Sequence, residues 1–203
     1  MTTNTILTRL QQLLPQLFQP LEISGDLYLR FQLTSEIPAL LSMERVLEAL
    51  LVPEETISSL PNLPAMTIGM MNSGDRVFCI VDLGQLLGLP PIAINPRDYQ
   101  VIRIDLPAQI ERVGDTPDRN SNKCLGLAVR QIRGVVRLET SQLQSSCGDV
   151  PECLTPYLMG SFIEDDRRSV VLNADAIAKA PALFHNPFLG VNSNLSQNSL
   201  STL

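Results

Sequence analysis

The sequence has little of what catalytic or nucleic-acid-binding proteins need. Tryptophan is absent and aromatic residues make up only 4% of the 203 residues, so any core must be aliphatic. The chain has one histidine, His185, which makes nucleophilic catalysis with a histidine base hard to build. Acidic residues outnumber basic residues by 21 to 15, and this balance disfavours a general nucleic-acid binder, which needs a basic face.

Signals for membranes, export, metals and cofactors are also absent. No apolar run reaches the roughly 18 residues that a membrane-spanning helix needs, and residues 1–10 lack the features of a secretory signal. We therefore expect a cytoplasmic protein whose four cysteines are reduced. Cys147 and Cys153 stand too far apart for a zinc knuckle, so we expect no metal site. Without a glycine-rich phosphate loop, we expect no cofactor.

An acidic run, Glu164-Asp165-Asp166, is followed at once by Arg167 and Arg168. A charged run between two apolar stretches is typical of a solvated hairpin turn. An enzyme with a hidden carboxylate site at Glu164 and Asp165 is the alternative interpretation. Turnover of a substrate would identify it.

The N-terminal residues carry an apolar stripe at helical spacing. The stripe follows the pattern i, i+1, i+4, i+7, i+8, i+11 and i+12, and consists of Ile6, Leu7, Leu10, Leu13, Leu14, Leu17 and Phe18. Pro15 lies on the opposite face and should kink or end the helix. We interpret residues 1–22 as a helical extension whose stripe packs either on its own domain or on a partner helix.

The rest of the chain up to residue 180 is typical of a β protein. Short apolar or alternating stretches are bounded by turn residues, as in strands. We predict strands at 27–33, 66–71, 77–81, 102–106, 125–129, 135–138, 157–163 and 169–172. Short helices are predicted at 83–87, with Asp82 as N-cap, and at 174–180. The segment 39–51 is ambiguous between a strand followed by a short helix and a single helix.

The two halves of the chain resemble each other. Gly69 precedes Asp82 by thirteen residues, and Gly160 precedes Asn173 by the same number. In each half a strand, a polar turn and an apolar strand lead to an Asp or Asn that begins a short helix. This pattern predicts two similar β units in tandem, and closely spaced short strands are typical of small barrels.

Several motifs follow one another at distinctive spacings. The first half contains Leu60-Pro61-Asn62-Leu63-Pro64, Gly69-Met70-Met71-Asn72 and Ile80-Val81-Asp82-Leu83. The second half contains the weaker Gly126-Leu127-Ala128-Val129, Gly134-Val135-Val136 and Tyr157-Leu158-Met159-Gly160. In this order, over residues 25–180, they resemble the CheW family of chemotaxis coupling proteins.

The resemblance implies a mainly β fold of two tandem SH3-like five-stranded β-barrels that share a core. The expected fold also has short helices, and the N-terminal amphipathic helix precedes it. We therefore expect a CheW-like domain at 23–185, with barrels at about 25–95 and 96–180. Residues 186–203, which carry no charge, are expected to form a flexible tail. The implied function is that of a non-catalytic adaptor, recruited to membrane receptor arrays without entering the membrane. It would couple a chemoreceptor tip to the regulatory domain of a CheA-type histidine kinase.

The resemblance also implies two interaction surfaces. A hydrophobic groove between the barrels, which takes the receptor's helical hairpin, corresponds to Met43, Val46, Leu47, Val135 and Val136. Simple core burial is the alternative explanation for Val46 and Leu47. The kinase contact corresponds to the turn Asn72-Ser73-Gly74-Asp75-Arg76. The family's Leu-Arg-Gly at this turn is Ser73-Gly74-Asp75 here. This departure marks a divergent member, such as occur in cyanobacterial phototaxis and pilus-motility systems.

A different class of function is the alternative. Small barrels serve many purposes, so the chain could be a structural or nucleic-acid-binding module unrelated to kinase coupling. The acidic balance and the low aromatic content disfavour nucleic acid, which would need a basic, aromatic groove. A salt-sensitive mobility shift with DNA or RNA would identify this alternative.

Overall fold

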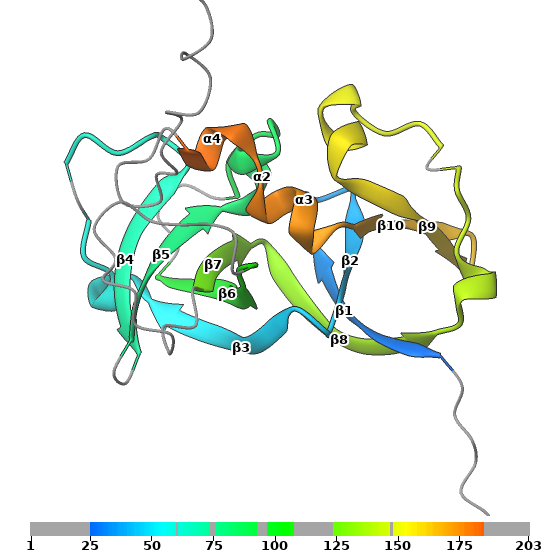
Figure 1. Ribbon diagram of the computed structural model, residues 1–203, viewed down its shortest axis with the longest axis horizontal. Helices are drawn as coiled ribbons and strands as arrows, with labels where there is room; N and C mark the ends of the chain where they lie inside the picture. The colour runs from blue at the N-terminus through cyan, green and yellow to red at the C-terminus, as the bar shows by residue number, and fades with distance from the viewer. Residues whose placement is uncertain are drawn as a thin grey trace, which may run out of the picture.

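The computed structural model describes residues 25–59, 61–73, 76–92, 97–107, 124–146 and 148–184. These residues form two β-sheets that lie side by side, with short helices along one side of their junction (Figure 1). The expected N-terminal helix and the tail at 186–203 lie outside the described residues, as do Gly74, Asp75, Cys147 and His185.

Ten strands make up the two sheets. They are β1 (Asp26–Gln32), β2 (Pro38–Ser42), β3 (Val46–Pro53), β4 (Thr67–Ser73), β5 (Arg76–Asp82), β6 (Asp98–Asp105), β7 (Cys124–Val129), β8 (Gln131–Leu138), β9 (Leu158–Glu164) and β10 (Arg167–Leu172). The α-helices are α2 (Leu83–Leu86), α3 (Ala174–Ala178) and α4 (Pro181–Phe184), and 3-10 turns occur at Glu54–Thr56, Thr140–Gln142 and Glu152–Tyr157.

Each sheet has five strands and curls into a barrel. Barrel A has the strand order β8-β1-β2-β10-β9, and barrel B has the order β3-β6-β7-β5-β4. Each barrel is closed by a pair of backbone hydrogen bonds between one edge strand and the segment that follows the other edge strand. Ser58 and Met70 exchange bonds of 2.8 and 2.9 Å in barrel B, and Gln144 and Ser161 exchange two bonds of 2.8 Å in barrel A. Two five-stranded barrels agree with the fold that the resemblance implies.

The division of the strands between the two barrels does not fall at the expected boundary between residues 95 and 96. Barrel B is one continuous segment, β3 to β7, inserted between the β1–β2 hairpin and the three remaining strands of barrel A. The hairpin joins barrel A because β1 pairs with β8 and β2 pairs in parallel with β10. The two barrels are therefore nested along the chain rather than strictly consecutive.

The predicted repeat of strand, turn, strand and helix is present in both barrels. The β4–β5 hairpin leads into α2, and the β9–β10 hairpin leads into α3. The Asp82 carboxylate accepts a hydrogen bond from the Gln85 amide at 3.1 Å, and the Asn173 side chain caps α3 in the same way. The acidic run forms the predicted hairpin turn, in which Asp165 and Asp166 have positive φ angles.

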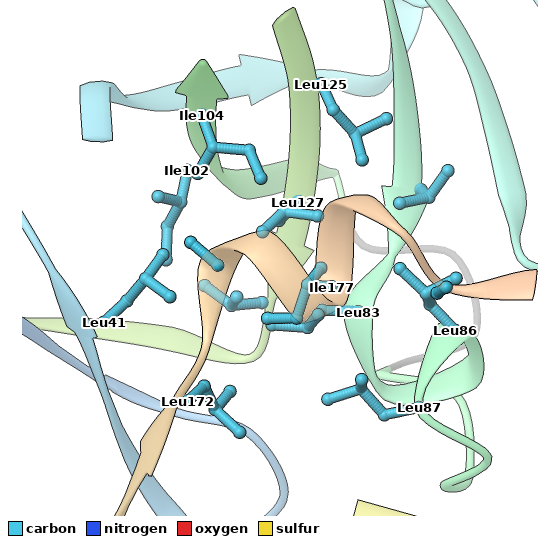
Figure 2. Packing of buried hydrophobic residues seen from close by; sticks show 14 of the residues in the cluster. Leu41, Leu83, Leu86, Leu87, Ile102, Ile104, Leu125, Leu127, Leu172 and Ile177 are labelled. Atoms are coloured by element: carbon cyan, nitrogen blue, oxygen red, sulfur yellow. The ribbon is translucent and has the colours of Figure 1, made fainter. Parts of the chain in front are cut away.

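Buried side chains form three clusters. The interior of barrel A contains Tyr28, Leu40, Leu138, Phe162 and Val171, and that of barrel B contains Val52, Phe78, Ile80, Val101, Cys124 and Ala128. The third and largest cluster, the shared core, lies between the barrels. Figure 2 shows its members Leu41 and Leu172 from barrel A, Ile102, Ile104, Leu125 and Leu127 from barrel B, and Leu83, Leu86, Leu87 and Ile177 from the helices.

The two-sided arrangement explains why several strands are apolar on both faces. Successive side chains of a strand point to opposite faces of the sheet. On β7, Leu125 and Leu127 therefore enter the shared core, while Cys124 and Ala128 enter barrel B, and all six residues of the strand are buried. The prediction that the strand at 77–81 is central is confirmed, because β5 lies between β4 and β7.

The segment 39–51 contains no helix, so the single helix and the short helix were both wrong, whereas the strand of the first interpretation is present as β2. It forms most of β2 and β3, which are joined by a tight turn at residues 43–45. Leu40 is inside barrel A, whereas Ala39 and Leu41 are in the shared core. Burial on both faces produces a continuous apolar run, which has no period that distinguishes a strand from a helix.

Candidate interaction surfaces

The face that forms the shared core continues beyond the area that the opposite barrel covers. Ala49 of β3 is directly opposite Ile102 of β6, and Val135 of β8 is directly opposite Leu29 of β1. Directly opposed residues share one face of a sheet, and both Ile102 and Leu29 belong to the shared core. Ala49 and Val135 thus lie on the shared-core face but are exposed, Val135 to 55%.

Other apolar side chains are exposed near these two residues along β1 and β3. Leu51 is two residues after Ala49 on the same strand, and Leu27 is two residues before Leu29. Leu47 occupies a bulge near the start of β3. We call Leu27, Leu47, Ala49, Leu51 and Val135 the inter-barrel patch. It is an exposed apolar margin of the shared core, a type of surface that commonly marks an interaction site.

A hydrogen bond between the barrels holds the two halves of this patch together. The Ile132 amide of β8 donates to Oε1 of Gln100 on β6 at 2.6 Å. Gln100 is directly opposite Leu51, so the strand pair that presents Leu51 is fastened to the strand that presents Val135. In Figure 1, β3 and β8 run along the side of the junction opposite α2 and α3. The patch therefore bridges both barrels.

The β4–β5 hairpin presents a second exposed region, on barrel B. Asn72 is exposed and is paired with Val77, whose side chain is 57% exposed. Ser73 is paired with Arg76, the first residue of β5. The hairpin carries polar residues beside an exposed valine, a combination suited to the rim of a protein interface.

Comparison with known proteins decides the family. Residues 27–182 match the family model of the CheW-like domain. The chain belongs to the CheW-like domain family. It is a family of non-catalytic scaffolds that serve chemotaxis, and the resemblance inferred from the sequence motifs is confirmed.

One solved structure supports the fold of this CheW-like domain. The scaffolding protein TtCheW from Thermoanaerobacter tengcongensis matches with a TM-score of 0.59 and 16% sequence identity. The match covers 76% of this chain and 92% of the TtCheW chain. A search of curated proteins gives no match.

The structure separates the five residues predicted to line a groove between the barrels. Leu47 and Val135 lie in the inter-barrel patch, and Met43 and Val46 are half-buried against the shared core. The Met43 amide donates to the Leu27 carbonyl at 2.9 Å, which ties the β2–β3 turn to the patch.

Val136 lies on the opposite face of β8 from Val135. It is directly opposite Tyr28 and packs against the interior of barrel A. Burial raises the pKa of the Tyr28 phenol, and the nearby carboxylates of Asp26 and Glu44 raise it further. Val136 therefore contributes to the barrel A interior rather than to the patch.

In the predicted kinase contact, the structure describes Asn72 and Ser73 and the backbone of Arg76, whereas Gly74 and Asp75 lie outside the described residues. Sequence reasoning missed Leu27, Leu51 and Val77 as exposed apolar residues. The signal for Leu51 was its alternation with half-buried Leu50 and buried Val52, which becomes visible once β3 is recognised as a strand.

A polar cleft of about 1040 Å³ lies at the end of barrel A. Its lining includes Arg30, Arg133, Arg168, Glu36 and Glu164, and Arg30 forms an ion pair of 2.7 Å with Glu164. Because both signs of charge line it, the cleft favours no one class of charged ligand. Among the described residues, no group of His, Cys, Asp or Glu is arranged to hold a metal ion, and no helix is long and apolar enough to cross a membrane.

Proposed function

We propose that this CheW-like protein couples a chemoreceptor-type sensor to a CheA-type histidine kinase by binding both proteins. The observation that carries the proposal is an exposed apolar patch on the junction between two barrels of a scaffold-family domain. An adaptor acts by burying apolar area within a polar rim, so it makes and breaks no covalent bond. Its output is geometry, since a small movement of the receptor shifts the kinase between its conformational states.

The system served by this coupling is chemotaxis, phototaxis or pilus motility. The protein would join receptor arrays at the membrane through its partners, without inserting into the bilayer or binding nucleic acid. Its receptor site is the inter-barrel patch, with Met43 and Val46 at its base. A helical hairpin at a receptor tip presents an apolar stripe, which would cover the exposed side chains of Leu47 and Val135.

A charge within the patch should weaken receptor binding. We expect Val135→Asp to reduce the affinity for a chemoreceptor-tip fragment about fivefold or more, because the carboxylate would lose its hydration at an apolar contact. Calorimetry with the purified fragment measures this. The matched control is Met159→Asp on β9, since Met159 is 59% exposed and lies outside the patch. Equal affinities of the two variants would contradict the assignment of the patch to the receptor.

The kinase site is the hairpin turn of barrel B, from Asn72 to Arg76. In this assignment Asn72 and Arg76 supply polar contacts, and exposed Val77 supplies apolar area beside them. The resemblance to the CheW family implies that the regulatory domain of a CheA-type kinase has the same type of fold as this chain. One barrel would therefore pack against a related barrel, and the hairpin would contribute to their contact.

A charge reversal in this turn should weaken kinase binding. We expect Arg76→Glu to reduce the affinity for the cognate kinase regulatory domain about tenfold, which corresponds to roughly 1.4 kcal/mol. Calorimetry between the purified proteins measures it. The matched control is Arg167→Glu, since Arg167 begins β10 as Arg76 begins β5 in the repeat. A folded natural chain that does not bind the domain at all would refute kinase coupling itself.

A further inference from the structure

The inter-barrel patch is close to the point where the described chain begins. Asp26 is opposite Leu138 at the end of β8, and three residues further on Leu29 is opposite Val135. At about 3.3 Å per strand residue, Val135 is roughly 10 Å from that starting point. Arg137 donates a hydrogen bond to the Gly25 carbonyl at 2.7 Å. This bond fixes the place from which the preceding 24 residues must extend.

Those preceding residues carry the apolar stripe of residues 6–18, and their only charged side chains are Arg9 and Glu22. We propose that residues 5–18 pack on the inter-barrel patch of the same chain through the apolar stripe of an amphipathic helix, which Pro15 kinks on the face away from the stripe. The patch consists of one alanine, one valine and three leucines, so a stripe of leucine, isoleucine and phenylalanine matches it chemically. An isolated helix of this length is marginal in water and gains stability by burying its apolar face.

The length of the segment allows this contact. Residues 19–24 span at most about 20 Å when extended, and a helix over residues 5–18 is about 21 Å long. Together they reach from Gly25 past Val135 to Leu51, which lies beyond the Gln100–Ile132 hydrogen bond. The point of entry also sets the direction of the helix. Phe18 is placed near Val135, and Leu7 is placed near Leu51.

The contact goes beyond the proposed coupling function. A receptor hairpin that uses the same patch must first displace the segment, which is held at high local concentration by its tether. The N-terminal segment thereby lowers receptor affinity in proportion to its own occupancy. The packing of the segment itself does not depend on the identity of the receptor.

Disulfide trapping in the full-length chain tests the proposal. Cys147 and Cys153 are first replaced by serine, and Leu7→Cys is combined with Leu51→Cys. Leu51 is 66% exposed, so its substitution leaves the barrel packing intact. We expect an intramolecular disulfide to form about tenfold faster than in a control that combines Leu7→Cys with Lys179→Cys. Lys179 is exposed at the end of α3, on the opposite side of the junction.

Two variants examine the face of the helix that makes the contact. Leu10→Asp with Leu14→Asp should abolish the rate difference, whereas Thr8→Asp with Gln12→Asp, on the opposite face, should preserve it. Equal rates for the Leu51 and Lys179 pairs would overturn the proposal. Mainly intermolecular disulfides would overturn it too, because the occupant would then be a second copy. A fast intramolecular disulfide in a chain that binds no receptor fragment would retain this inference and refute only the receptor assignment.

Discussion

The Leu127→Ala variant is expected to have a free energy of unfolding about 3 kcal/mol lower than that of the natural chain. Leu127 is fully buried in the shared core, where it lies among the side chains shown in Figure 2. Its strand is hydrogen-bonded on both sides, with Ile102 opposite it on β6 and Val81 opposite it on β5. The backbone therefore cannot move in to fill the space that the lost methyl groups leave.

Urea denaturation followed by circular dichroism and by tyrosine fluorescence measures this loss. The matched control is Leu51→Ala, because Leu51 is 66% exposed and its truncation should change the stability by no more than about 0.5 kcal/mol. Both probes should report one transition, since the shared core contains side chains from both barrels. Two separate transitions would show that each barrel is stable without the other and would contradict this account of the shared core.

Local sequence signals predicted much of the fold. Period-two alternation located β1, β6 and β7, and a continuous apolar stretch located β5. The capping roles of Asp82 and Asn173 could be predicted because an N-cap acts within three residues of its own position. The repeat was visible for the same reason, since each copy is a hairpin and a short helix that are contiguous in sequence.

Long-range pairing could not be predicted in the same way. The parallel pairs β2–β10 and β5–β7 join segments far apart in sequence, and the alternation of a strand does not say which strand lies beside it. The assignment of β1 and β2 to barrel A depends on such pairs, which is why the division at residues 95 and 96 differs from the sheets. The order of the motifs identified the family because the motifs come from both halves of the chain and are compared together.

The candidate site shows the same limit at the level of single residues. Val135 and Val136 are adjacent and both apolar, so the motif placed them together in one groove. In the structure the register of β8 against β1 sends Val135 to the patch and Val136 into barrel A. That register shifts at a bulge between Arg30 and Phe31, opposite Gly134. Which of the two valines is exposed is therefore determined by the pairing of two strands that are far apart in sequence.

The Gly160→Ala variant is expected to lose about 2–3 kcal/mol of stability, because a Cβ at this position would press on the bond pair that closes barrel A. Such a Cβ would stand 2.6 Å from the carbonyl oxygen of Gln144. This oxygen accepts the Ser161 amide, and the Gln144 amide donates to the Ser161 carbonyl, both at 2.8 Å. Relief of the clash requires the Gln144 segment to move away, which stretches both bonds. Chemical denaturation, with hydrogen exchange at the Gln144 and Ser161 amides, measures the effect.

Gly69→Ala should behave alike in barrel B, because a Cβ there would stand 2.7 Å from the Ser58 carbonyl oxygen, which accepts the Met70 amide. Met159→Ala, next to Gly160 but 59% exposed, is the control and should leave amide exchange at the bridge unchanged. If both glycine variants had the same free energy of unfolding as the natural chain, the closing bridges would contribute little to the stability of either barrel. Similar losses of stability in both variants would mean that Gly69 and Gly160 have equivalent roles in the closure of the two barrels. The spacing from each glycine to its helix cap would then reflect a physical requirement of the barrel, which explains why the repeat is visible in the sequence.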